Sequence, residues 1–430
     1  MTMDRIKKLT AEKLPFLKRH YFLILGLIFF YLGIIIRFEL RDLVSGDMTL
    51  YLRPWYFEIA SGGGFDYLGT QVGDYNILYQ TIIAAFTYLP LEEIHAYKLF
   101  SCVFDLFLAL FSAYVVYGFA EKQKKTAALA AFGAVFLSPI VFMNSAWWGQ
   151  CDAIYAFFGI VSLYLLAKNK TLFSLIVYGI SFAFKLQAIF LLPVFLFTIF
   201  CRKKWQFVYL LFIPVVMIIL SLPGIIAGRN VIDVFTVYLN QTGTYAELDL
   251  NYPSIWAIPS DVVYAIDFIA GDELVSQGQI YNIFKYPAIL TAVAVLAVHM
   301  LKWLRRRVEL SAINIFRMGF LLSYTCVLFL PGMHDRYGFV YEMLALILAF
   351  VDKKTIVPMF IIHGISLIDY LAFLTNFRCI PMSVLLVGNI IAYIMYTRLI
   401  YRSLFPPENN GEKTKPADPS KKVIAVAVKD

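Results

Sequence analysis

Charged residues are scarce in this chain of 430 residues. Asp, Glu, Lys and Arg make up 15% of it, whereas 60% of the residues are hydrophobic and the mean hydropathy is +0.73. Because a soluble chain carries roughly a quarter charged residues, this composition excludes an ordinary soluble protein. The net charge of +8 lies in short basic clusters between apolar runs. That pattern indicates membrane topology and not a nucleic-acid surface.

Cysteine is also sparse, and its placement excludes two further classes of protein. The five cysteines are odd in number, scattered, and without the paired spacing of a zinc site. We therefore expect no disulfide framework and no cofactor; a divalent metal ion is possible but nothing in the sequence indicates one. No small-residue cleavage site follows the first apolar stretch, so residues 21–36 are expected to stay in the protein as a first span.

The apolar runs and the basic clusters together predict an all-α polytopic membrane protein. Runs of about 20 apolar residues are candidate spans, and Lys/Arg clusters mark the cytoplasmic side. If every basic cluster is cytoplasmic, an even number of spans separates each pair, which gives about twelve transmembrane helices with both chain ends inside. The expected spans are residues 21–36, 97–119, 126–143, 154–167, 171–184, 187–200, 206–222, 283–301, 311–330, 340–351, 355–371 and 381–400.

Two long outer segments remain, residues 37–96 and 223–282, and both are acidic. In the first of them, the apolar residues of 48–59 recur at helical spacing and include Trp55 and Tyr56, which predicts an interfacial helix lying on the membrane. The apolar run 77–89 is too short to cross and is expected to be re-entrant. We take 1–405 as one transmembrane domain and 406–430 as a disordered basic cytoplasmic tail.

Charged and polar residues at span ends fall on the predicted outer side, although each ionisable group at membrane depth costs about 2.5–3.5 kcal/mol. Asp47, after the first span, is either a general base or a helix cap. Trp148, Gln150 and Asp152 close one span and open the next. The tryptophan is either a membrane-belt residue or a platform for sugar, and Asp152 either a sugar ligand or a cap.

Two basic motifs complete the expected site. Lys185 interrupts a run that is too long for one span, and two short helices meeting at this lysine would place it at the outer tip of a hairpin. There it is either a snorkelling side chain or a phosphate ligand. The sequence His334–Asp335–Arg336–Tyr337 is either a solvated loop or an anion site in which Arg336 binds phosphate through two nitrogens.

In this order the motifs resemble those of the membrane-embedded GT-C glycosyltransferases, in particular bacterial relatives of the PIG-V mannosyltransferases. Two departures from the family pattern are Asp335, where relatives usually have Glu, and Ile77–Leu78, where they often have Pro-Pro. The matching motifs are Ser45–Gly46–Asp47, Pro54–Trp55–Tyr56, Asp74–Tyr75–Asn76, Trp148–Gly149–Gln150–Cys151–Asp152, Phe184–Lys185–Leu186–Gln187–Ala188, Asn251–Tyr252–Pro253–Ser254–Ile255–Trp256 and His334–Asp335–Arg336–Tyr337.

The resemblance implies an inverting transfer of a hexose, with mannose favoured, on the outer or lumenal face of the membrane. The compact loops and the lack of an organelle-retention signal favour a bacterial plasma membrane. The donor would be a polyprenyl-phosphate sugar and the acceptor a glycan or a lipid-linked glycan; membrane lipids, and no nucleic acid, are the other partners. The implied base is Asp47, and the implied phosphate ligands are Lys185, His334 and Arg336. The expected sugar or acceptor ligands are Trp148, Gln150, Asp152, Asp335, Tyr337, Tyr75 and Asn251.

Two other functions fit a chain with many spans. A transporter or flippase of lipid-linked glycans would have mid-membrane charges, but this sequence shows no repeated halves and keeps its charges at span ends. A polysaccharide polymerase would bind diphosphate-linked glycans, for which several outer arginines are expected. The segment 223–282 contains only Arg229.

Overall fold

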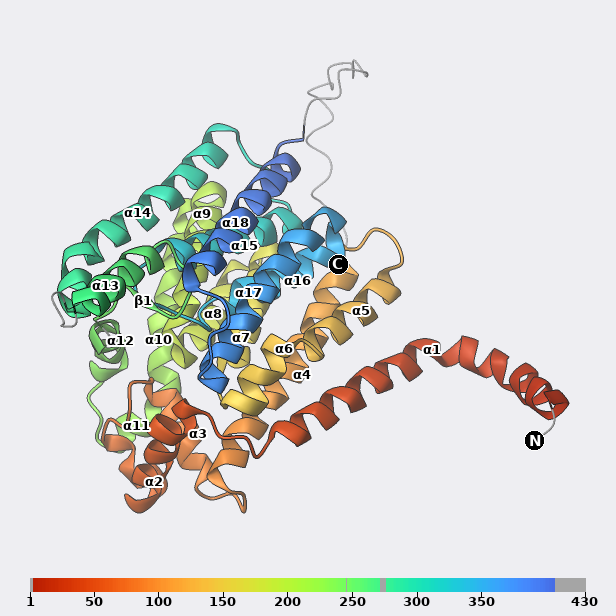
Figure 1. Ribbon diagram of the computed structural model, residues 1–430, viewed down its shortest axis with the longest axis horizontal. Coiled ribbons are helices and arrows are strands. Elements are labelled where there is room, and N and C mark those ends of the chain that lie inside the picture. Colours follow the sequence, from red (N-terminus) through yellow and green to blue (C-terminus); the bar gives the residue numbers. More distant parts are fainter. Residues whose placement is uncertain (1–2, 245, 271–275, 407–430) are drawn as a thin grey trace.

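The apolar runs form helices because a backbone inside a bilayer must satisfy its own hydrogen bonds. The protein is described here by a computed structural model covering residues 3–244, 246–270 and 276–406, most of them helical (Figure 1). The helices and helical turns of the first half are α1 (Met3–Leu40), η1 (Met48–Leu52), α2 (Arg53–Ser61), η2 (Gly64–Gly69), α3 (Ile77–Phe86), α4 (Glu93–Phe119), α5 (Lys124–Phe136), α6 (Pro139–Phe142), η3 (Met143–Trp148), α7 (Asp152–Ala167), α8 (Thr171–Phe184), η4 (Leu186–Leu191), α9 (Leu192–Arg202), η5 (Lys204–Leu211) and α10 (Phe212–Leu220). Those of the second half are α11 (Leu222–Ile226), α12 (Asp233–Thr244), α13 (Ala257–Ala270), α14 (Gln277–Arg305), α15 (Ala312–Phe329), α16 (Phe339–Val351), η6 (Lys353–Thr355), α17 (Ile356–Thr375) and α18 (Met382–Leu404).

The predicted spans fall mainly on these helices, and the polytopic membrane class is confirmed. Among the described residues, six helices are long and apolar enough to cross a membrane, namely α1, α4, α14, α15, α17 and α18. A seventh crossing results if α5 and the bent α6–η3 segment count as one span. The other predicted spans lie on shorter helices such as α8, whose 14 residues extend about 21 Å against a hydrocarbon core of about 30 Å. The number twelve therefore stays a prediction.

The break at Lys185 is where the sequence predicts it. Helix α8 ends at Phe184, Lys185 has extended backbone angles, and η4 with α9 continues the chain. The chain reverses here, since the ring of Tyr178 on α8 lies 4.7 Å from that of Phe195 on α9. This reversal places Lys185 at the tip of a helical hairpin, next to the start of α7.

The first outer segment contains the predicted helix, but its apolar face does not lie on the membrane. Met48, Leu52 and Ile59 are at most 1% exposed and belong to the protein's main hydrophobic core. The interfacial interpretation of this face is therefore wrong. Helical spacing of apolar residues predicts that one face of the helix is shielded from water, and here other parts of the protein, not lipid, shield it. Helix α3 also packs inward, through Ile77 and Ile83, so the re-entrant interpretation is not confirmed. Figure 1 shows α2, α3 and α11 gathered at one end of the bundle.

Helix α1 joins the bundle only through its last turns, and its N-terminal half extends away from the other helices (Figure 1). At the joint, a nitrogen of Arg37 lies 2.9 Å from a carboxylate oxygen of Asp105, and both side chains are buried. The ammonium of Lys98 on α4 donates to the carbonyls of Leu40 and Arg41, and to that of Leu43. The carbonyl of Leu40 ends α1 without a partner inside the helix, and those of Arg41 and Leu43 lie in the segment that follows it. Lys98 thereby fixes where the chain leaves α1.

A short parallel pairing connects the two halves of the chain. Strand β1 (Asp249–Leu250), in the second outer segment, pairs with β2 (Met333–His334), so that Leu250 is opposite His334. This pairing brings the second outer segment to the His-Asp-Arg-Tyr motif. The predicted tail 406–430 lies, after its first residue, outside the described residues.

Candidate active site

The turn after α1 holds Asp47 by contacts with the Trp148–Gly149–Gln150 segment. The hydroxyl of Ser45 donates to the backbone oxygen of Trp148 at 2.8 Å and accepts from the backbone nitrogen of Met48 at 3.1 Å. Gly149 has φ +80°, and a Cβ there would lie 2.4 Å from the end of the Met48 side chain. The positive φ favours glycine here, and any other side chain would also have to displace the end of Met48.

The carboxylate of Asp47 accepts hydrogen bonds from two side chains that are distant in sequence. Its Oδ2 accepts from Nε1 of Trp148 at 2.8 Å and from Nε2 of Gln150 at 2.6 Å. An Nη1 of Arg336 lies 3.5 Å from the same oxygen. Asp47 makes no capping hydrogen bond to the helix that follows it, and Ser45 takes that role. The cap interpretation of Asp47 is therefore wrong.

Asp152, at the start of α7, is the second acid of the site and is fully buried. Its Oδ1 accepts from Nζ of Lys185 at 2.5 Å, and its Oδ2 accepts from Nδ2 of Asn144 at 2.8 Å. The Nε of Arg336 lies 3.7 Å from Oδ2. Arg336 thus stands between the carboxylates of Asp47 and Asp152. No side-chain cap is present at the start of α7.

The turn His334–Tyr337 supplies Arg336, the cation that lies between the two acids. Nδ1 of His334 lies 2.5 Å from Oδ1 of Asp335, and Nη1 of Arg336 lies 3.4 Å from the same ring nitrogen. The ring of Tyr337 is 5.7 Å from that of His334. Burial lowers the pKa of Arg336, but the carboxylates of Asp47, Asp152 and Asp335 outweigh it and hold that pKa well above its usual value. Arg336 therefore keeps its charge.

Exposure separates the residues that a substrate can touch from those that support them. The side chains of His334, Asp47 and Arg336 are 18%, 13% and 10% exposed. Asp152 and Lys185 are 0% and 2% exposed, so they lie behind this accessible edge. Lys185 is therefore not a snorkelling side chain, because its charge is held by Asp152.

Trp148 does not have the role that the sequence suggests. It is completely buried, with its ring 4.3 Å from that of Phe373 and the guanidinium of Arg336 5.3 Å from its centre. It is neither a membrane-belt residue nor an open platform for sugar. Both interpretations of Trp148 are therefore wrong. Its contribution is the indole N–H that holds Asp47.

The two remaining predicted residues differ in their placement. The hydroxyl of Tyr75 donates to Oε1 of Gln150 at 3.2 Å, and its ring lies 5.7 Å from Nζ of Lys185. Tyr75 therefore belongs to the cluster. The backbone of Asn251 forms a bridge with His334, but its side chain accepts from Arg378 at 3.4 Å and lines a different, acidic pocket.

Sequence reasoning missed two polar residues of this cluster. Asn144, which binds Asp152, is the last strongly polar residue in the apolar run before the tryptophans, and that isolation was its only signal. Asp74 precedes Tyr75 in a motif that the sequence did single out. Burial raises the pKa of the Asp74 carboxyl above its usual value, and the nearby charges of Arg336 and Lys185 oppose the shift.

Within the described residues, no group of three or more His, Cys, Asp or Glu side chains is placed to hold a metal ion. The carboxylates of the cluster are instead paired with Lys185 and Arg336. The expectation that the protein needs no cofactor stays a prediction.

The buried pair of Asp152 and Lys185 gives a test of the cluster's stability. Replacing one partner, in Asp152→Asn or Lys185→Met, leaves a buried charge uncompensated and should cost about 3–5 kcal/mol. The double variant should lose clearly less than the sum of the two, because neither charge remains. Thermal unfolding in detergent micelles measures this difference. The same pair of substitutions at the exposed Arg41 and Asp42 is the control. Purely additive losses of stability at Asp152 and Lys185 would contradict the pairing.

Fold and site together define a polytopic membrane protein whose buried carboxylates and cations come from segments far apart in the chain. The chain belongs to glycosyltransferase family 87, whose profile matches residues 75–331, more than half of its length. The matched region includes Tyr75, Trp148–Asp152, Lys185 and Asn251. No curated protein matches the chain.

This family assignment makes the protein a membrane glycosyltransferase, with a sugar donor, an acceptor and membrane lipids as its partners. It supports glycosyl transfer over the transporter alternative. A polysaccharide polymerase also transfers sugar, and that alternative stays open. The narrower resemblance to the PIG-V mannosyltransferases stays a prediction.

Proposed function

We propose that the protein moves a hexose, with mannose favoured, from a polyprenyl-phosphate donor to a glycan or lipid-linked acceptor on the extracytoplasmic face of a bacterial plasma membrane. The observation that supports this most strongly is the position of Arg336 between the carboxylates of Asp47 and Asp152. One acid next to a fixed cation suits a reaction in which a proton leaves one reactant and a phosphate leaves the other.

In the proposed mechanism, Asp47 is the general base. Its three partners in the described part of the chain all contact Oδ2, which leaves Oδ1 to take the proton of the acceptor hydroxyl. The acceptor oxygen then forms a bond to the anomeric carbon while the bond from that carbon to the phosphate oxygen breaks. The electron pair of the broken bond remains on the polyprenyl phosphate. Attack from the face opposite the phosphate inverts the anomeric configuration.

The phosphate would lie at the accessible edge of the cluster, against Arg336 and His334. Arg336 can offer two nitrogens to a phosphate, and its charge stabilises the negative charge that develops as the bond breaks. Lys185 would act from behind, since it is buried against Asp152. By offsetting the charge of Asp152 it leaves more of the positive potential of Arg336 for the donor.

Asp152 and Trp148 then act as positioning residues, and not as sugar ligands. Asp152 orients Arg336 and Lys185, and Trp148 orients Asp47. We propose that Gln150, Asp335, Tyr337 and Tyr75 line the space for sugar or acceptor. Asn251 stays a proposed acceptor contact, because its backbone forms a bridge with His334.

The proposal is tested with purified protein in lipid nanodiscs and a set of polyprenyl-phosphate hexoses. With no acceptor identified, water can take its place, and we expect release of free hexose and polyprenyl phosphate. With candidate glycan acceptors, we expect a glycosidic product of inverted configuration, as read by NMR. A product of retained configuration, or transfer only from diphosphate-linked donors, would contradict the mechanism. Uptake into vesicles without bond formation would support the transporter.

A further inference from the structure

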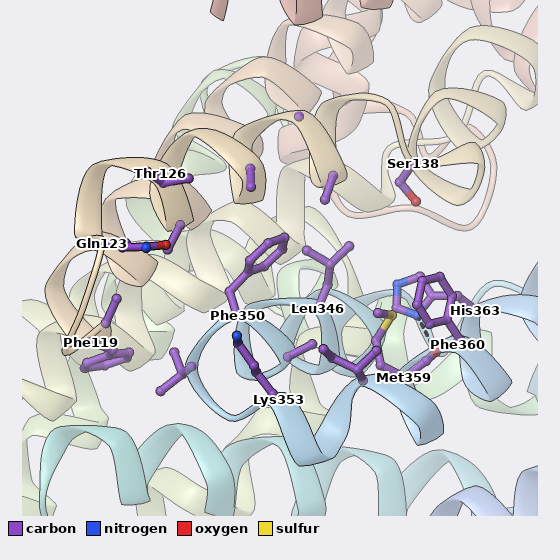
Figure 2. Close-up of a pocket in the computed structure, with 18 of the residues that line it drawn as sticks. Phe119, Gln123, Thr126, Ser138, Leu346, Phe350, Lys353, Met359, Phe360 and His363 are labelled. Atoms are coloured by element: carbon purple, nitrogen blue, oxygen red, sulfur yellow. Dashed lines mark hydrogen bonds between the residues drawn. The ribbon is translucent and has the colours of Figure 1, made fainter. Parts of the chain in front are cut away.

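One hollow in the protein lies apart from the charged cluster and shares no residue with it. It is a cavity of about 1450 Å³ lined by the end of α4, by α5, by the start of α15, by the end of α16 and by α17. Figure 2 shows Thr126 on one side of it and Phe350, Met359 and His363 on the other. We call this cavity the α5–α17 groove.

The walls of the groove are apolar, and the groove is wide because several of the side chains that line it are small. Helix α16 packs on both α5 and α17 and forms the floor through Leu346 and Phe350. Helix α5 contributes Ala127, Ala130 and Ala134. At the rim, Phe360 of α17 is 66% exposed, which shows that the groove opens to the outside of the bundle. Around a membrane protein, an apolar surface of this kind faces lipid chains.

The length of the groove corresponds to one leaflet of a bilayer. Along α17 its lining runs from Ile356 to Leu367, a distance of about 16 Å at the helical rise of 1.5 Å per residue. Half of the hydrocarbon core of a bilayer is about 15 Å thick. One acyl chain of ordinary length would therefore fill the groove from the membrane surface to the bilayer centre.

The charges lie at one end only. Lys122, Arg317 and Lys353 line the mouth together with the single acid Glu121, so the mouth has an excess of positive charge. Lys122 and Lys353 belong to basic clusters at helix ends that the positive-inside rule assigns to the cytoplasm, and Arg317 lies in the second turn of α15. Cations at headgroup level attract anionic lipids of that leaflet.

We propose that the α5–α17 groove binds one molecule of an anionic phospholipid from the cytoplasmic leaflet. Its phosphate lies among Lys122, Arg317 and Lys353, and one acyl chain lies against Ala130, Leu346 and the other apolar walls. The charge of the mouth selects the headgroup, because an acyl chain gains little by moving from lipid into an apolar groove. The inference does not depend on the proposed reaction, since the groove lies at the opposite, basic end of the helices.

Gly364 allows the groove to be filled without disturbing the protein. A Cβ at Gly364 would meet no atom within 4 Å, so the side chain of a Gly364→Leu variant enters open space in the groove. Val357 on the same helix is 60% exposed and is not part of the lining. The variant Val357→Leu therefore adds bulk to α17 outside the groove and is the matched control.

The experiment measures lipid retention by native mass spectrometry. Protein stripped of lipid in detergent is mixed with vesicles of phosphatidylglycerol and phosphatidylcholine in equal amounts and then re-extracted. We expect the wild type and Val357→Leu to retain one phosphatidylglycerol, and Gly364→Leu to lose it. Replacing Lys122 and Lys353 by Gln should reduce the preference for phosphatidylglycerol about five-fold for each cation, whereas Lys204→Gln, a basic residue outside the groove, should not.

Three outcomes would overturn the inference. They are equal retention of phosphatidylcholine by the wild type, retention of phosphatidylglycerol by Gly364→Leu, and an unchanged preference after both lysines are replaced. Because the lysine variants keep the apolar walls, they provide the test even where Gly364→Leu does not fold.

Discussion

Asp47→Asn should lower the turnover of sugar transfer by about 100- to 10,000-fold, which is the range for loss of a general base. An asparagine side chain can still accept the hydrogen bonds of Trp148 and Gln150 through its carbonyl oxygen, so the turn should keep its shape. It cannot take a proton. Donor binding and membrane insertion should remain close to those of the wild type, as measured by donor titration and by expression in membranes.

Asp42→Asn is the matched control for this variant. Asp42 lies on the same turn, is exposed, and pairs with Arg41 and His95 at the surface. It should transfer sugar as well as the wild type. Full turnover by Asp47→Asn would remove the role of base from Asp47. It would direct attention to Asp74, a further acid on which the charges of Arg336 and Lys185 act.

Arg336 should be the second most sensitive position, and even lysine should not replace it. The guanidinium lies close to Asp47 with one nitrogen and to Asp152 with another, at 3.5 and 3.7 Å. A lysine is a single point charge and cannot keep both contacts while binding a phosphate. Arg336→Lys should therefore weaken donor binding and lower turnover by about 100- to 1000-fold, the cost of losing a group that stabilises developing charge.

Arg336→Met should have a further effect, on stability. It leaves the carboxylates of Asp47 and Asp152 without the cation between them, which should cost about 3–5 kcal/mol. Thermal unfolding separates the two variants, because Arg336→Lys should remain closer to the wild type. Arg53→Lys is the control, since Arg53 pairs with Glu93 away from the cluster. Equal activity of Arg336→Lys and Arg53→Lys would contradict the phosphate role.

The sequence predicts the helices and the break at Lys185 well, because both depend on local properties. A long apolar run must form helix in a membrane, and a charged residue inside such a run must be at a turn or in a cavity. What surrounds each helix depends instead on segments that are distant in the sequence. The face of Met48, Leu52 and Ile59 is apolar whether protein or membrane covers it, and only the packed structure shows that protein does.

The residue types of the site could also be predicted from the sequence, but not their pairing. The ordered motifs brought Asp47, Lys185 and Arg336 to attention. Nothing in their spacing shows that Lys185 faces Asp152, or that the indole of Trp148 points to Asp47. Those contacts join residues that are 33 and 101 positions apart. The direction of the Asn251 side chain, toward Arg378, depends on the β1–β2 pairing in the same way.

The position of Arg336 between the two acids has a consequence for how the protein is made. During synthesis the segment with Asp47 enters the membrane among the first, followed much later by the turn that carries Arg336. Contacts between parts of the chain so distant in sequence form slowly, since a long loop must close first. The nascent protein therefore holds an incomplete candidate site until most of its length is inserted. A chain truncated before α15 is expected to be inactive even if every earlier helix has formed.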